Sequence, residues 1–128
     1  MNVDLNISVL IIDDHLEMRQ IVCNLLKQLG FRNVDQSPGV KIAMEMLHCK
    51  KYGLVIADDN MVHMGGLDVI DKICSDRKLR DTPCFLVTGQ GKKSEITDPS
   101  VARFFTYIQT PFNVAELKSK LTTLVGNF

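Results

Sequence analysis

The chain has 128 residues, 45% hydrophobic and 23% charged, so the sequence predicts one globular domain spanning residues 1–128 and excludes a disordered or fibrous chain. Fifteen basic residues balance fifteen acidic ones, which argues against the positive field that nucleic-acid or membrane binding uses. The apolar runs are too short to span a bilayer and no signal segment stands out, so we expect a cytoplasmic protein.

Short apolar runs alternate along the chain with segments of helical periodicity. The runs predict buried strands at Val9–Ile12, Asn33–Ser37, Leu54–Ala57, Phe85–Val87 and Phe104–Ile108, of which the second is the weakest. Apolar residues spaced three and four apart predict helices at about residues 18–29, 40–47, 67–74 and 114–125. Gly30 ends the first of these helices and Asn113 caps the last. Pro99 leaves room only for a short or bent helix at about residues 92–100.

This alternation predicts an α/β domain in which helices cover both faces of one doubly wound parallel sheet. In such a sheet the functional site lies outside the carboxyl ends of the strands, where the strand order reverses. The residues that follow the strands are therefore the first candidates for function.

Polar residues follow four of the expected strands. Asp13 and Asp14 come after the first strand, Asp58 after the third, Thr88 after the fourth and Thr110 after the fifth. Three neighbouring carboxylates would repel one another, and Mg²⁺, which prefers oxygen ligands, would relieve that repulsion. A carboxylate beside such a cation is suited to accept a phosphoryl group. The simpler alternative is that solvated Asp and Asn residues only begin loops, but the coincidence at four strand ends favours a functional site.

Over essentially its full length, the chain resembles the CheY-like receiver domains of response regulators in two-component signalling. The matching segments are Val9–Asp14, Tyr52–Asp58, Asn60–Met61, Gly66–Leu67, Leu86–Gly89 and Pro111–Phe112. The resemblance implies a flavodoxin-like, CheY-like fold with five parallel strands in the order 2-1-3-4-5. It also implies a signalling domain that is not an enzyme, apart from self-phosphorylation by small donors and loss of its own phosphoryl group.

The resemblance implies that Asp58 accepts a phosphoryl group from a histidine kinase or a phosphotransfer protein. It further implies that Mg²⁺ is bound by Asp13, Asp14, Asp58 and the backbone carbonyl of Asn60.

Further positions match the part of the family that responds to phosphorylation. Thr88 matches the hydroxyl that moves toward the phosphoryl group, and Tyr107 matches the aromatic switch of the fifth strand. Gly89 matches the small residue beside the phosphoryl group. Asn60 and Gln90 match two positions that tune how fast the group is lost.

The chain departs from the family most clearly at Thr110, where nearly all members have a lysine before the Pro-Phe pair. A hydroxyl supplies no positive charge to phosphoryl oxygens. Val62 replaces the usual proline, Asp59 adds a carboxylate beside Asp58, and Pro99 disturbs the helix that usually passes on the signal. Two readings follow: a phosphorylated receiver with weakened switching, which we favour, or a pseudo-receiver adaptor that acts by protein contact alone.

Because no output module follows the last expected helix, we expect a stand-alone receiver, a monomer or weak dimer that binds neither nucleic acid nor membrane. Its downstream protein target is expected at the face formed by residues 92–100, the fifth strand and the last helix. The segment Gly89–Ser94 lacks the spacing of a phosphate-binding loop. A phosphatase of the haloacid dehalogenase class is disfavoured because its Asp-x-Asp pattern is missing.

The cysteines and the histidine beside the acidic pair receive simpler interpretations. Cys23, Cys49, Cys74 and Cys84 are expected to be free, buried and hydrophobic in role. His15 lies near Asp13 and Asp14 but is interpreted as a loop residue without a role rather than a modulator of the site.

Overall fold

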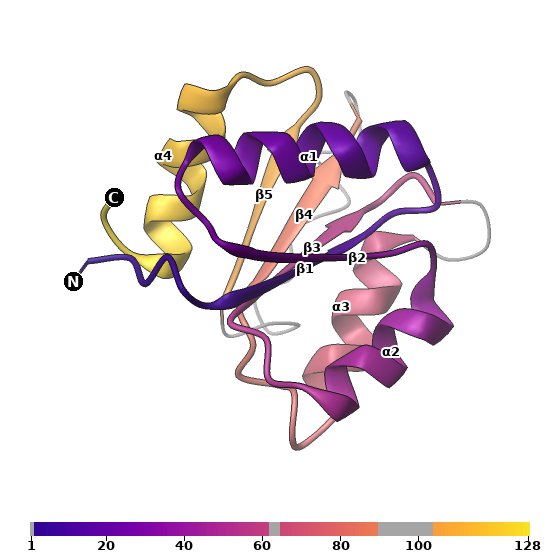
Figure 1. Ribbon diagram of the computed structural model, residues 1–128. Helices are drawn as coiled ribbons and strands as arrows, with labels where there is room; N and C mark the ends of the chain where they lie inside the picture. The colour runs from indigo at the N-terminus through magenta and orange to yellow at the C-terminus, as the bar shows by residue number, and fades with distance from the viewer. Residues whose placement is uncertain (1, 62–64, 90–103) are drawn as a thin grey trace.

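The computed structural model describes residues 2–61, 65–89 and 104–128 and forms one five-stranded parallel sheet flanked by helices (Figure 1). The strands are β1 (Ser8–Ile12), β2 (Asn33–Ser37), β3 (Leu54–Asp58), β4 (Cys84–Thr88) and β5 (Phe105–Gln109). The helices of the described residues are α1 (Leu16–Gln28), α2 (Val40–Cys49), α3 (Gly66–Ser75) and α4 (Val114–Val125). The sheet order is β2-β1-β3-β4-β5, which confirms the expected topology.

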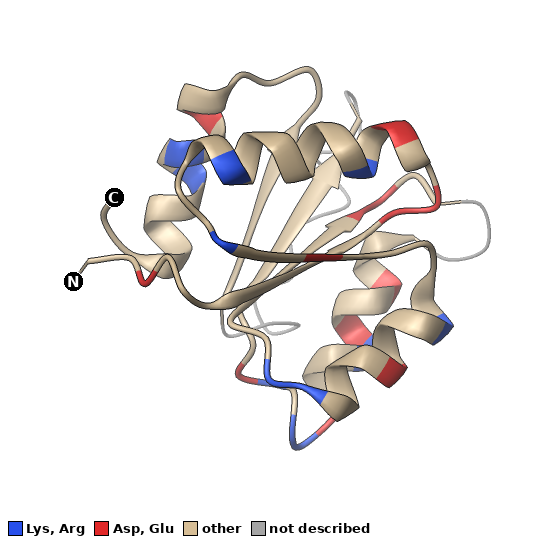
Figure 2. Ribbon diagram, viewed as in Figure 1, with Lys and Arg blue, Asp and Glu red and all other residues tan. Residues whose placement is uncertain are grey.

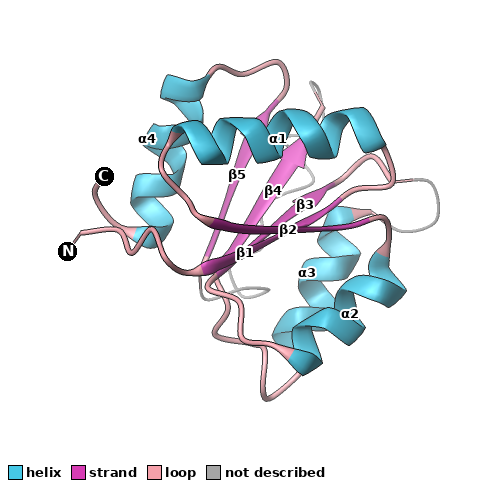
Figure 3. Cartoon of the chain, viewed as in Figure 1, coloured by secondary structure: helices cyan, strands magenta, loops and turns pink. Residues whose placement is uncertain are grey.

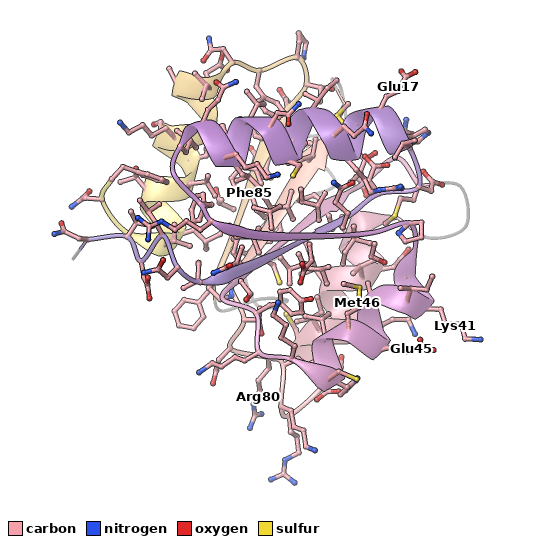
Figure 4. The ribbon with its side chains drawn as sticks, viewed as in Figure 1. Glu17, Lys41, Glu45, Met46, Arg80 and Phe85 are labelled. Carbon is pink, nitrogen blue, oxygen red and sulfur yellow. The ribbon has the colours of Figure 1, made fainter. Side chains whose placement is uncertain are left out.

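Helices cover both faces of the sheet, with α1 and α4 on one face and α2 and α3 on the other (Figures 1 and 3). Successive residues of a strand point to opposite faces. Val9 and Ile11 therefore pack with α1 and α4, whereas Leu10 and Ile12 pack with α2 and α3. Phe85 is fully buried in the first of these two layers, between the sheet and α1 (Figure 4). This double burial explains why the central strands are continuous apolar runs rather than alternating ones.

The helix ends follow the local signals in the sequence. Gly30 follows α1 with a φ of +107°, a conformation that favours glycine. The side chain of Asn113 accepts a hydrogen bond of 2.8 Å from the backbone N–H of Glu116, which caps α4 as expected.

Most expected elements are confirmed, with shifts of one or two residues at several ends. The fifth strand begins at Phe105 rather than Phe104, whose side chain is 45% exposed. The short helix expected at about residues 92–100 lies outside the described residues. Among residues 2–61, 65–89 and 104–128, no helix has the length and apolar character needed to cross a membrane.

The cysteine prediction needs one correction. All four thiols are free, and Cys23 and Cys84 are buried as expected, but Cys74 is only partly buried and Cys49 is exposed. Cys49 is the last residue of α2, whose buried residues are Ala43 and Leu47, and a residue two positions after Leu47 points away from that buried side of a helix.

Candidate functional site

The carboxyl ends of β1 and β3 bring the candidate acidic residues together. These strands are neighbours, and Ile12 of β1 lies opposite Ala57 of β3 in the parallel register. Asp13 follows Ile12 and Asp58 follows Ala57, so the two carboxylates lie side by side at this edge of the sheet. Figure 2 shows acidic residues gathered here, beside the start of α1. Parallel pairing therefore converts two distant sequence positions into one acidic site.

His15 lies against all three carboxylates of this site. Its Nδ1 atom is 2.9 Å from Asp13 Oδ1, 2.9 Å from Asp14 Oδ1 and 3.8 Å from Asp58 Oδ2. The residue Asp13 is only 2% exposed, whereas the His15 side chain is 51% exposed. The sequence placed His15 near the acidic pair but did not predict that its ring would lie against all three carboxylates. The only sequence signal was its place two residues after Asp13.

The backbone around Asp13 explains how this group of residues, Asp13, Asp14, His15 and Asp58, is held. The backbone N–H of His15 donates a 2.9 Å hydrogen bond to Asp13 Oδ1, which folds the loop back on itself. The Arg19 guanidinium donates to the backbone carbonyl of Asp13 at 2.7 Å. Asp13 Oδ2 is buried and has no hydrogen-bond partner among the described residues. A buried carboxylate oxygen of this kind is costly unless a cation or donor satisfies it.

Burial, neighbouring charges and hydrogen bonds raise the pKa values of two residues of the site, Asp58 and His15. Burial is the main cause that raises the pKa of Asp58 to about 6, and the neighbouring Asp13 raises it further. The backbone N–H of Asn60 opposes this shift by donating a 3.2 Å hydrogen bond to Asp58 Oδ1. Hydrogen bonding to Asp13 is the main cause that raises the pKa of His15. The site thus has an excess of negative charge that a cation would neutralise.

A cavity of about 340 Å³ opens beside Asp58 and gathers most of the remaining candidates. It is lined by His15, Glu17, Met18, Ile21, Asp58, Asn60, Thr88, Gly89 and Thr110. The three residues from α1 were not singled out by the sequence, because their periodicity indicated only a helix. Figure 4 shows Glu17 projecting from the first turn of α1 at this end of the sheet.

The two threonines of the cavity come from adjacent strand ends. Thr88 is fully buried, and its Oγ1 lies 3.5 Å from the carbonyl oxygen of Gly89. Thr110 donates from its backbone N–H to the carbonyl of Thr88 at 2.8 Å, and its hydroxyl lies 3.4 Å from the same oxygen. The peptide bond between Thr110 and Pro111 is cis. Thr110 is therefore present in the cavity that holds Asp58 but brings no charge to it.

Tyr107 lies apart from this cavity. It is partly buried on β5 against the layer formed with α2 and α3, and Lys120 Nζ lies 5.2 Å from its ring centroid. Gln90 and Val62 lie outside the described residues, as does residue 99. The structure therefore brings together Asp13, Asp14, Asp58, Asn60, Thr88 and Thr110 but does not bring Tyr107 to them.

Comparison with known proteins agrees with this arrangement. The family described as response regulator receiver domain matches residues 9–122. The chain is 37% identical over 116 residues to chemotaxis protein CheY-3 of Vibrio cholerae, covering 91% of this chain and 89% of that protein. It is 33% identical over 114 residues to chemotaxis protein CheY of Pseudomonas aeruginosa, covering 89% of this chain and 92% of that protein.

Solved structures show the same fold. Chemotaxis protein CheY4 of Vibrio cholerae superposes with a TM-score of 0.82 at 21% identity, covering 93% of this chain and 98% of that one. The response regulator TrrA of Thermotoga maritima, solved in complex with Mg²⁺ and BeF, has a TM-score of 0.77 at 26% identity. That match covers 91% of this chain and 97% of the other.

Proposed function

The chain belongs to the CheY-like response regulator receiver domains, and from that premise we propose that it accepts a phosphoryl group on Asp58 from a histidine kinase or phosphotransfer protein. Receiver domains are signalling domains rather than classical enzymes, and they interact with histidine kinases and with downstream targets. The convergence of Asp13, Asp14 and Asp58 at one edge of the sheet is the observation that carries the proposal.

The residues present fit the Mg²⁺ that receiver domains bind at their acidic pocket. Buried Asp13 Oδ2, without a partner among the described residues, is the kind of oxygen that a hard divalent cation satisfies. Asp13, Asp14, Asp58 and the backbone carbonyl of Asn60 would hold the ion. When bound, Mg²⁺ supplies positive charge that offsets the negative charge of the phosphoryl oxygens.

Asp58 is the nucleophile of the proposed transfer. One of its carboxylate oxygens forms a bond to phosphorus while the bond between phosphorus and the donor's imidazole nitrogen breaks. The donor nitrogen keeps the electron pair and is protonated. The side chain of Asp58 is only 13% exposed, but it lines the cavity through which a donor reaches it. Burial therefore orients the acceptor without closing it off.

The hydroxyl of Thr88 is proposed to move toward the phosphoryl group after transfer, since it lines the same cavity as Asp58. Thr110 replaces the usual lysine and contributes no cation, so we propose that acceptance is retained and that the conformational response is weaker. Tyr107 and the face of β5 and α4 are proposed to carry that response to a downstream protein.

The test treats the protein with a small-molecule phosphodonor and Mg²⁺ and follows its intact mass. We expect one added phosphoryl group in the wild type and none in Asp58→Asn. Asp59→Asn is the matched control, because it removes the same charge one residue along the chain, and it should still be modified. Modification that survives in Asp58→Asn would refute the assignment. If no donor modifies the wild type and beryllium fluoride produces no response, the alternative is favoured, namely a pseudo-receiver adaptor that acts by protein contact alone.

A further inference from the structure

The imidazole of His15 occupies an unusual place within the acidic site. Its Nδ1 atom lies 2.9 Å from one carboxylate oxygen of Asp13 and 2.9 Å from one of Asp14. In the absence of a metal this spacing is that of a hydrogen bond from a protonated Nδ1 to Asp13 Oδ1, and a metal ion bound by Nδ1 would take the place of that proton.

The spacing of these atoms is that of adjacent ligands around one ion. In an octahedral site with bonds of about 2.1 Å, neighbouring ligand atoms are about 3.0 Å apart, because the edge is the bond length multiplied by √2. Potential ligand atoms of Asp13, Asp14 and His15 all lie within 4.8 Å of one another. Asp58 Oδ2, at 3.8 Å from Nδ1, is near enough to join the same coordination sphere.

Independent features point to a ligand here rather than to an isolated acidic cluster. Asp13 is 2% exposed, yet its Oδ2 has no hydrogen-bond partner among the described residues. The Arg19 guanidinium donates to the backbone carbonyl of Asp13 and to Gln36 Oε1. Arg19 therefore does not neutralise the Asp13 carboxylate, and the positive charge at this carboxylate comes from a proton on His15 or from a bound metal ion.

We propose that His15 supplies Nδ1 as a ligand to the divalent cation of this site. The proposal rests on the metal site of the proposed function. An imidazole nitrogen suits borderline transition metals, whereas Mg²⁺ prefers oxygen ligands. With His15 as a ligand, the ratio of Co²⁺ or Ni²⁺ affinity to Mg²⁺ affinity is therefore larger than the carboxylates alone would give.

The test measures the dissociation constants of Mg²⁺ and Co²⁺ by calorimetry at fixed pH for the wild type, His15→Gln and His48→Gln. His15→Gln keeps a polar side chain but removes the imidazole, and we expect its ratio of Co²⁺ to Mg²⁺ affinity to fall at least about tenfold. His48 lies on α2 and is engaged with Asp76, so His48→Gln should leave the ratio unchanged and serves as the control.

Paramagnetic NMR gives a second readout that does not depend on affinity. Bound Co²⁺ should shift the ring-proton resonances of His15 far outside the normal range, and these resonances should be missing in His15→Gln. An unchanged affinity ratio with no shifted ring protons would overturn the role of His15 while leaving the Mg²⁺ site intact. If Asp13→Asn lowers the affinity for neither Mg²⁺ nor Co²⁺, Asp13 does not bind the metal. That result would contradict the metal site of the proposed function as well.

Discussion

Gly66 lies at the closest approach between α3 and the strand that carries Asp58, and replacing it by alanine tests this packing directly. A Cβ at Gly66 would clash with Leu86 Cδ1 and would lie 3.0 Å from the backbone carbonyl oxygen of Asp58. Leu86 is fully buried, so its side chain cannot relieve the clash by moving into solvent. The Asp58 carbonyl belongs to β3 and moves only if the strand moves.

The expected cost follows from this overpacking. Inserting a methyl group into a packed core typically costs about 1–3 kcal/mol, so Gly66→Ala should lower the free energy of unfolding by that amount. For a domain of this size, each kcal/mol corresponds to a fall of about 4 °C in Tm. Gly39→Ala is the matched control, because a Cβ there meets nothing within 4 Å and the backbone is extended. Its stability should change by less than about 0.5 kcal/mol, since the loss of a glycine cap and the stiffer unfolded chain oppose each other.

Urea unfolding followed by far-ultraviolet circular dichroism measures both variants, because the chain has no tryptophan to report by fluorescence. The slope of the unfolding free energy against urea should stay constant, so that the shift in midpoint reports stability alone. If the free energy of unfolding of Gly66→Ala is within about 0.5 kcal/mol of the wild-type value, α3 does not pack against β3 as closely as described.

Two further predictions concern charge and cysteine reactivity. The pKa of Asp58 is raised to about 6 in the folded protein, whereas it is about 4 in the unfolded chain. Protonation of Asp58 therefore stabilises the folded state. This stabilisation is complete below a pH of about 4 and is lost as the pH rises through about 6. In the presence of a chelator, Asp58→Asn should therefore melt at a higher temperature than the wild type at neutral pH, with the difference shrinking in acid. A lower Tm for the variant at neutral pH would contradict this, and Mg²⁺ should raise the Tm of the wild type more than that of the variant. Cys49 is exposed, whereas burial raises the pKa of Cys84 to about 12, so a thiol reagent should react with Cys49 first. Cys49→Ser should remove the fastest phase of labelling, and its persistence would show that another thiol is more accessible.

The sequence by itself determined the fold class and the candidate acidic residues. Continuous apolar runs such as Val9–Ile12 indicate strands that are buried on both faces, and the cap at Asn113 marks where a helix begins. Asp13 and Asp58 directly follow the apolar part of their strands, and strand ends are where an open parallel sheet places its site. These signals are local, since each depends on residues within one or two turns of the chain.

The tertiary structure alone decided which of these residues meet. The register of Ile12 against Ala57 places Asp13 beside Asp58, and the loop after β1 turns His15 Nδ1 onto both members of the acidic pair. Cys49 follows the apolar stripe of α2 and Cys84 begins the apolar run of β4, yet only Cys84 is buried in the core between the sheet and a helical layer. Periodicity specifies which face of an element is apolar, but strand pairing and loop conformation, which depend on distant residues, specify what that face and its ends touch.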